Sequence, residues 1–359
     1  MSAAAVFYLT TLLVYVGVDI LAVWSLNLQW GIAGIPNLAW ILFQSAGAYT
    51  AAVLTLGPSS GNGGFQSYII GARLPFPLPV LAGGLVAGAL AALVGLVVLR
   101  RLRGDYQAVV LLVITVTATL LVENFPRFLN GPAGLALIPQ PLSSRFASSI
   151  GYAWFYVALT AAVCAVVYFL VVRRITGSPL GRALRATRDC DFAAAALGKN
   201  IVGLRLFVFV VGGVIAGISG ALLVEFITAW SPGGWMYVES LVVFTAIIVG
   251  GTGNDFGVMV GALLVPVLFN EITRYIPTFG SPYLVDALQW VVIGGLALLF
   301  MWFRPRGLFP ERRRTMALGG PGTTVAGPGQ AGVEAGRPGA SQGSGAGTST
   351  AVGGAGSGL

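Results

Sequence analysis

Long apolar runs with almost no charge recur along this chain, and they constrain its fold more than any other feature. The first run, Ala3 to Leu26, contains a single charged residue, Asp19. About 20 such residues form a helix that crosses the hydrocarbon core of a bilayer. Charged residues make up only 9% of the chain, whereas soluble domains have about a quarter, so most of the surface must face lipid. Because the runs are continuous rather than alternating, they favour helices over a closed barrel.

Nine candidate spans follow from these runs, and the sequence therefore predicts an all-α, polytopic transmembrane helical bundle. Some of the spans are short or broken by glycine. They are Ala3–Leu26, Leu38–Leu56, Pro77–Leu99, Ala108–Val122, Tyr152–Val172, Leu204–Ile227, Leu241–Val249, Phe256–Phe269 and Leu284–Phe303.

Three clusters of basic residues predict the orientation of the bundle. They follow the third span, fill the loop between the fifth and sixth spans, and follow the last span. With nine spans, all three clusters fall on the same side of the membrane. Since basic residues favour the cytoplasmic side, we expect the N-terminus outside and the C-terminus in the cytoplasm.

The composition changes close to Arg314. From Gly319 onward the chain is rich in Gly, Ala, Ser, Thr and Pro and has almost nothing to bury. Such a segment cannot offset the entropy lost on ordering. We therefore expect a transmembrane domain over residues 1–314 and a disordered tail over residues 315–359.

The basic loop over residues 173–205 predicts two short helices. Ser178 and Pro179 are typical of a helix start, with a capping hydroxyl before a proline in the first turn. A second helix is expected over residues 192–197, and Gly198 suits its left-handed end. We expect two aspartates before this second helix, at positions 189 and 191, to cap it.

Two functions are compatible with this loop. Its basic residues and its short apolar ridge suit an amphipathic segment resting on anionic lipid head groups. They also suit a docking element for a cytoplasmic protein. The candidate docking residues are Arg182, Arg185, Asp189, Asp191, Phe192, Ala193, Ala194, Leu197 and Gly198.

Two glycine-rich blocks precede or interrupt short spans. Small residues allow close packing of helices, and broken helices expose backbone polar groups to a transport path. For Asn37 and Asn254, path lining and simple helix capping remain as alternatives. The candidate path residues are Gly31, Gly34, Asn37, Gly250, Gly251, Gly253 and Asn254.

Asp19 is the acidic residue placed deepest in a predicted span. Charge inside a membrane is costly, so Asp19 needs a partner or a wet cavity. A carboxylate that couples transport to protons is a further alternative, although no buried lysine or histidine is available to work with it.

Five sequence blocks, in order, resemble the branched-chain amino acid ABC permeases of the LivM and LivH kind. The closing "FRPRGLFP" at 303–310 is also typical of that family. Together they cover nearly the whole chain before the predicted tail. The five blocks are "GIAGIPNLAWILFQSAGAYTAA" (31–52), "LRGDYQAVVLLVIT" (102–115), "NGPAGL" (130–135), "GRALRATRDCDFAAAALGKNI" (181–201) and "GGTGNDFGVMVGALL" (250–264).

The resemblance implies a permease subunit that is not itself an enzyme. Its cytoplasmic loop would enter a groove on a separate ATP-binding subunit, which would hold ATP and Mg²⁺. It further implies a second related permease, a substrate-binding protein outside, and a bacterial or archaeal plasma membrane. The importer-wide pattern of Glu-Ala-Ala, three residues and Gly is matched at Ala193, Ala194 and Gly198. Its acidic position is occupied by Phe192, so the sequence does not specify a particular salt bridge there.

Several classes of function can be weighed from the residues. The single lysine, Lys199, stands in Gly-Lys-Asn without the hydroxyl residue of a phosphate-binding loop, so this chain should not bind ATP. The absence of histidine from the sequence excludes a histidine triad, a histidine proton relay and a histidine-bound metal. The basic clusters indicate topology rather than nucleic-acid binding. The resemblance favours an ABC permease for branched-chain or other hydrophobic amino acids over one for urea, amides or sugars, and over a gradient-driven transporter.

Overall fold

The computed structural model describes residues 3–58, 66–102, 104–269, 271 and 282–311. Within these ranges the chain is helical, with connecting loops and two isolated β-bridges. The predicted tail over residues 315–359 lies outside the described residues.

A helix occupies each of the nine predicted spans, which confirms the polytopic all-α bundle. Six segments of the described chain are long and apolar enough to cross a membrane; they contain α1, α3, α4, α6, α10 and α11. The nine helices are α1 (Ala3–Leu26), α2 (Trp40–Thr55), α3 (Leu78–Arg101), α4 (Gly104–Asn124), α6 (Ser149–Val167), α10 (Ile201–Ile227), α11 (Tyr237–Gly250), α12 (Asp255–Ala262) and α14 (Pro282–Phe303).

The helices extend beyond the apolar centres that the sequence marks. α11 begins at Tyr237 rather than Leu241, and α4 begins at Gly104 rather than Ala108. Backbone hydrogen bonding continues through polar residues at a helix end, whereas hydropathy finds only the part that lies in hydrocarbon. The predicted limits were therefore too narrow at these helices.

Three helices continue into wider π-helical turns. α1 continues through Asn27–Ile32, α6 through Tyr168–Val172 into α7 (Arg173–Gly177), and α12 through Leu263–Phe269. The last of these contains Pro266, which has no N–H to donate and so disturbs regular α-helical bonding.

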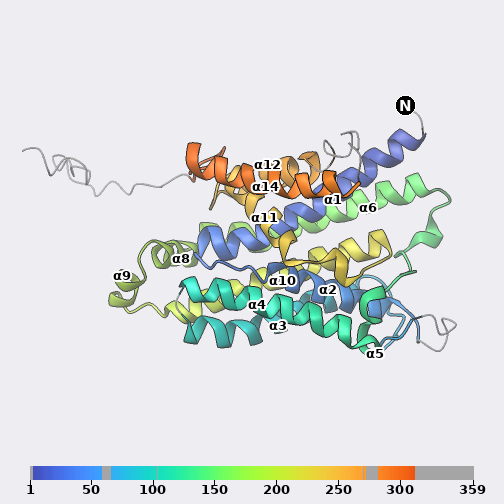
Figure 1. Cartoon of the computed structure of the whole chain (residues 1–359), viewed down its shortest axis with the longest axis horizontal. Coiled ribbons are helices and arrows are strands. Elements are labelled where there is room, and N and C mark those ends of the chain that lie inside the picture. The colour runs from blue at the N-terminus through green and yellow to red at the C-terminus, as the bar shows by residue number, and fades with distance from the viewer. Residues whose placement is uncertain (1–2, 59–65, 103, 270, 272–281, 312–359) are drawn as a thin grey trace, which may run out of the picture. The chain divides into compact units, whose positions relative to one another are not determined.

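α10 lies at the centre of the bundle and packs on α2 and α3. Glycines make this contact possible: a Cβ added to Gly217 of α10 would lie 2.9 Å from the Gly83 carbonyl oxygen and 3.2 Å from the Gly84 Cα. In Figure 1, α3 and α4 lie on one side of α10 and α2, and α1, α12 and α14 lie on the other. Close backbone approach through small residues is the usual way in which membrane helices associate.

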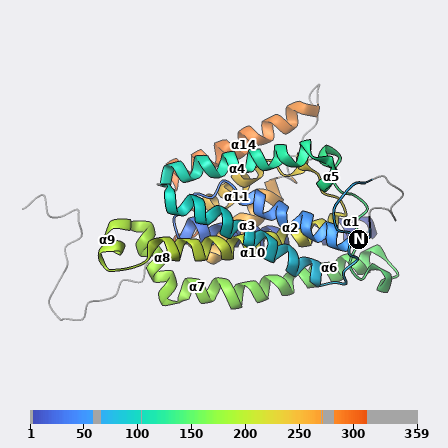
Figure 2. The same cartoon turned by 90° about the horizontal axis from the view of Figure 1, so that it is seen from below.

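The two ends of the bundle differ. α8 (Pro179–Asp189) and α9 (Asp191–Ala196) project from one end, which we call the loop end. The short helix α5 (Pro126–Leu129) lies at the opposite end, as Figures 1 and 2 both show. α10 starts beside α9 and runs the length of the bundle, so residues near its C-terminus lie at the opposite end.

Candidate functional site

The loop between α6 and α10 forms the two helices expected from the sequence. The Ser178 hydroxyl accepts a hydrogen bond from the Gly181 N–H at 3.4 Å, and Pro179 is the first residue of α8. α9 ends before Gly198, whose φ is +71°. A left-handed residue at this position closes a helix without the steric cost that a Cβ brings.

The prediction that aspartates cap α9 was wrong. The residue before α9 is Cys190, and its side chain makes no capping hydrogen bond. Asp191 instead pairs with Arg205 of α10, with Arg205 nitrogens 2.7 and 3.0 Å from its two oxygens. Asp189 lies 3.5 Å from Arg188 and is mostly exposed. Arginines close by in space compete for these carboxylates, and an ion pair with two charge-assisted hydrogen bonds is the stronger interaction.

α8 is anchored to the segment that follows α14. Arg185 Nε lies 2.5 Å from Glu311 Oε1, and an Arg188 terminal nitrogen lies 2.9 Å from Glu311 Oε2. Arg185 also donates to the Thr176 carbonyl at 3.1 Å, and Arg188 donates to the Gly31 carbonyl. One carboxylate therefore holds two arginines of the loop against the membrane helices.

α9 carries the exposed apolar residues of the loop. Phe192 is 85% exposed and Leu197 is 77% exposed. Ala193 is also exposed, whereas Ala194 is only 3% exposed and faces inward, so the predicted apolar ridge is correct except at Ala194. Arg182 is exposed on α8, away from the Glu311 contact. The loop thus presents a short, apolar and partner-free tip among the described residues, on a base fixed by ion pairs.

The two glycine-rich blocks meet directly beneath α8. The Gly253 N–H donates to Asn27 Oδ1 at 3.0 Å, and a Cβ on Gly31 would lie 2.8 Å from the Gly253 nitrogen. A Cβ on Gly34 would lie 2.9 Å from Cγ of Arg188. We call this contact of the two blocks with α8 and Glu311 the loop-end junction. In the structure these glycines pack closely against neighbouring atoms, and their place on a transport path stays a prediction.

The remaining glycines of the second block pack in the same way. A Cβ on Gly250 would lie 2.7 Å from the Gly257 carbonyl carbon, and one on Gly251 would lie 3.0 Å from the Phe309 carbonyl carbon. Both positions therefore require a small residue for packing.

Asn254 has the capping role of the two alternatives, whereas Asn37 caps no helix and lies in a buried hydrogen-bond network. Asn254 Oδ1 accepts from the N–H groups of Phe256 and Gly257 at 3.1 and 3.3 Å, which caps α12. Asn37 is fully buried; its Oδ1 accepts from the Ala39 N–H at 3.0 Å. Its Nδ2 donates to Gln29 Oε1 at 2.6 Å. Both amides are thus used in internal hydrogen bonds.

A cavity of about 480 Å³ opens between α1, α2, α10 and α11, away from these residues. We call it the acidic cavity, because Asp19 and Glu239 both line it. Neither carboxylate has a hydrogen-bond partner or an ion pair among the described residues. The indole nitrogen of Trp230, also in its wall, is buried without an acceptor there.

The acidic cavity answers the question that Asp19 posed in the sequence. The sequence predicted either a partner or a wet cavity for Asp19, and the structure has a cavity there. Two unpaired carboxylates in apolar surroundings attract positive charge, and an unpaired indole N–H offers a hydrogen bond to an anion. Only Asp19 was singled out from the sequence, because Glu239 approaches it only through the packing of α11 on α1.

An apolar helical bundle with a cavity between its helices and a loop that projects from one end is typical of membrane transport proteins. The chain belongs to the family of branched-chain amino acid transport system/permease components, whose profile matches residues 8–301. It is therefore a multi-pass membrane protein of a transport permease family.

Named relatives agree with this family. The high-affinity branched-chain amino acid transport system permease protein LivM of Salmonella typhimurium is 30% identical over 82% of this chain and 68% of its own length. A probable LivM of Methanocaldococcus jannaschii is 29% identical over 85% of this chain and 94% of its own length. The xylose transport system permease protein XylH of Haemophilus influenzae is 31% identical over 40% of this chain and 37% of its own length. No solved structure gave a significant match.

Proposed function

We propose that this chain is the permease subunit of an ATP-binding cassette importer for branched-chain or other hydrophobic amino acids. The family, and the relatives that cover most of the chain, support a permease of this substrate class. The relative named for xylose transport matches a smaller part of the chain. Sugars, together with urea and amides, are therefore the competing substrates in any transport assay.

In this proposal, the exposed tip of α9 couples the permease to the ATP-binding subunit. A coupling element must contact its partner differently in the two transport states, because equal contact shifts no equilibrium. Phe192 and Leu197 offer apolar side chains to a groove, and the ion pairs at Asp191 and Glu311 transmit movement to α10 and to the loop-end junction. A loop resting on lipid would need no such rigid base.

The rest of the assembly follows from this role. ATP and Mg²⁺ bind to a separate cytoplasmic subunit that docks on α9. A second, related permease completes the membrane part, and a binding protein outside delivers the substrate. The N-terminus lies outside and the loop end lies in the cytoplasm, in the orientation that its basic residues favour.

We assign the predicted path glycines to packing at the loop-end junction and the acidic cavity to the transport path. Its two carboxylates suit the ammonium group of an amino acid, and Trp230 suits the carboxylate group. Path residues that bind the substrate only weakly allow it to leave again, as transport requires.

ATP-driven uptake by the reconstituted complex tests the proposal. The chain is co-purified with its ATP-binding subunits, placed in liposomes, and supplied with its binding protein and labelled L-leucine. Uptake should require ATP and should exceed that of xylose or urea. Uptake driven by an ion gradient without ATP would instead establish a secondary transporter.

The Phe192→Glu variant tests the coupling role of α9. It should insert normally but lose about 90% or more of its uptake, since burying an unpaired charge in an apolar groove costs several kcal/mol. ATP hydrolysis should no longer respond to the loaded binding protein. Ala186→Glu, which adds the same charge on the exposed face of α8, is the matched control and should transport normally. Normal uptake by Phe192→Glu would leave the loop as a lipid-surface element.

A further inference from the structure

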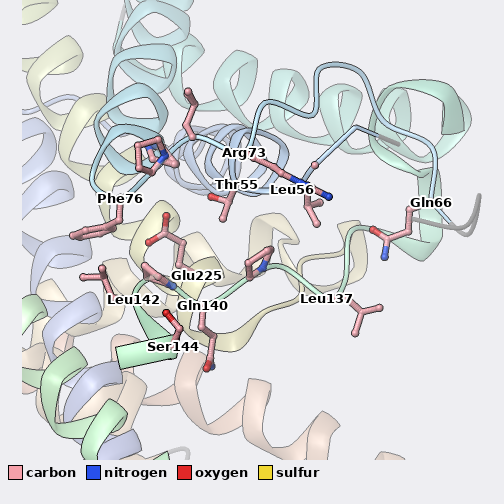
Figure 3. Close-up of a pocket in the computed structure, with 16 residues that line it drawn as sticks. Thr55, Leu56, Gln66, Arg73, Phe76, Leu137, Gln140, Leu142, Ser144 and Glu225 are labelled. Atoms are coloured by element: carbon pink, nitrogen blue, oxygen red, sulfur yellow. The ribbon is translucent and has the colours of Figure 1, made fainter. Parts of the chain in front are cut away.

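A second cavity, of about 730 Å³, lies at the opposite end of the bundle. We call it the outer cavity. Its walls come from the end of α2, the segment before α3, the segment after α5 and the end of α10. Figure 3 shows Glu225 of α10 between the side that carries Thr55 and Arg73 and the side that carries Leu137 and Ser144. The volume falls within the roughly 300–1,000 Å³ typical of small-molecule sites.

Glu225 is the unusual feature of this cavity. It is only 1% exposed, and its Oε2 atom is buried with no hydrogen-bond partner among the described residues. It also has no ion pair there. Burying a charged carboxylate without a partner is strongly unfavourable, and a bound cationic group would supply the missing partner. The natural complement is a positively charged group.

Arg73 provides the opposite charge at the rim of the same cavity. Its side chain is exposed and makes no ion pair with the described residues, although it lies against Gly57. A long arginine with no carboxylate of its own is free to turn toward an anionic group, which it binds with two parallel hydrogen bonds. The remaining wall is largely apolar, with Leu56, Phe76 and Leu142 among its residues.

The walls of the outer cavity are fixed before any ligand arrives. Ile138 N–H donates to the Thr228 carbonyl at 3.1 Å, and the Gln140 amide donates to the Phe226 carbonyl at 3.3 Å, so the segment after α5 is tied to α10. The segment before α3 is tied to α2, with the Arg73 N–H donating to the Leu56 carbonyl at 3.2 Å.

The backbone of this wall is also strained. Arg73, Leu137 and Leu142 all have positive φ, at 46°, 56° and 58°. L-residues with a side chain rarely adopt this region, and such strain clusters where a site is held in a particular shape.

We propose that the outer cavity is a binding site for the zwitterion of an apolar amino acid. Glu225 holds the ammonium group, Arg73 receives the carboxylate group, and the leucines and Phe76 surround the side chain. Because this ligand class rests on the proposed function, the outer cavity is the place where the permease first receives its substrate. From there the amino acid passes to the acidic cavity, which the segment around Leu135 and Trp230 separates from the outer one.

Binding of labelled L-leucine to the purified full-length chain in lipid nanodiscs tests this site. Glu225→Gln and Arg73→Gln should each weaken binding about tenfold or more, because each removes a charged hydrogen bond to the ligand. Arg127→Gln, which removes an exposed arginine of α5 that does not line the outer cavity, is the matched control and should leave leucine binding unchanged.

Two leucine analogues distinguish the loss of a contact with the ligand from disruption of the fold. 4-Methylpentanoate lacks the ammonium group, so Glu225→Gln should bind it as well as the unaltered chain does. Leucinamide lacks the carboxylate, so Arg73→Gln should bind it as well as the unaltered chain does. Equal losses for leucine and for the matching analogue would show disruption of the fold and would overturn the site, as would a variant that binds leucine normally.

The same preparations distinguish this site from the proposed function. If the complex takes up leucine with ATP but the chain binds no leucine, the outer site is refuted and the permease function stands. The same conclusion follows if both variants take up leucine at the unaltered rate. Absence of both uptake and binding would refute the proposed function together with the site.

Discussion

Glu311 connects two arginines of α8 to the segment that follows α14. It binds both Arg185 and Arg188, and all three side chains are 30% exposed or less. Ion pairs that are partly buried and share one carboxylate are stronger than isolated surface pairs. We therefore predict that Glu311→Gln loosens α8 by about 1–3 kcal/mol, which should appear as faster hydrogen exchange of the α8 amides.

Asp189→Asn is the control for this prediction. It alters another acidic partner of Arg188, at 3.5 Å and with 68% of its side chain exposed. Such a pair contributes about 0–1 kcal/mol, so exchange in α8 should barely change. If the two variants accelerate exchange equally, Glu311 is not the anchor of the loop.

Gly217 is the residue on which the packing of the central helices depends. Its hydrogen atom faces α3, and an added Cβ would overlap Ala87. Overpacking of this kind typically costs about 1–3 kcal/mol. Gly217→Ala should therefore lower the thermal unfolding temperature of the detergent-solubilised chain.

Gly295→Ala provides the matched comparison within a membrane helix. No atom of the described residues lies within 4 Å of a Cβ added to Gly295 of α14. Since alanine is a better helix former than glycine, this variant should be neutral or slightly more stable. A loss of stability as large as that of Gly217→Ala would mean that the close approach of α10 and α3 is not the cause.

At the scale of elements, the end of α9 depends on backbone conformation alone. Gly198 has φ +71° and nothing within 4 Å of an added Cβ. A β-branched residue is strained in this conformation by about 1–2 kcal/mol, whereas asparagine tolerates it. Gly198→Val should therefore fray α9 and reduce ATP-driven uptake, and Gly198→Asn should retain most of it. Equal uptake by both variants would show that the shape of this helix end is unimportant.

The elements were predictable where the signal is local. Apolar runs located nine helices of the bundle, and Ser178, Pro179 and Gly198 located the ends of α8 and α9, because capping and left-handed closure depend on adjacent residues. The limits of α4 and α11 were too narrow because polar residues at a helix end still bond to the turn before them.

The partners of polar side chains were not predictable in the same way. Glu311 lies 123 residues from Arg188 in the sequence, and Asn27 lies 226 residues from Gly253. Such pairs form only when distant helices pack, so one sequence carries no local sign of them. For the same reason the aspartates before α9 were expected to cap it, although Arg205 lies closer in the fold.

Glu225 illustrates most clearly what one sequence alone does not predict. In the sequence it is one acidic residue near the end of an apolar run, where a solvated position is the simplest expectation. In the structure it is buried in the outer cavity, because the segment after α5 covers the end of α10. The outer cavity thus comes from the covering of a helix end, which hydropathy does not describe.

At the scale of the whole molecule, the proposed function requires one orientation. The outer cavity must face the binding protein and α9 must face the ATP-binding subunit, on opposite sides of the membrane. The native cysteines allow this to be tested directly, since Cys190 is exposed beside α9 and Cys164 is buried in α6. We predict that a membrane-impermeant maleimide labels Cys190 only after the cells are opened.

The labelling is done on the chain expressed without its partner subunits, so that no docked protein shields Cys190. Ser144→Cys in a Cys190→Ala background is the control: Ser144 is exposed at the outer cavity and should react in intact cells. Labelling of Cys190 in intact cells would place α9 outside, where no ATP-binding subunit can reach Phe192 or Leu197. The ABC importer proposal would then lose its coupling element, whereas the assignment of the fold and the family would stand.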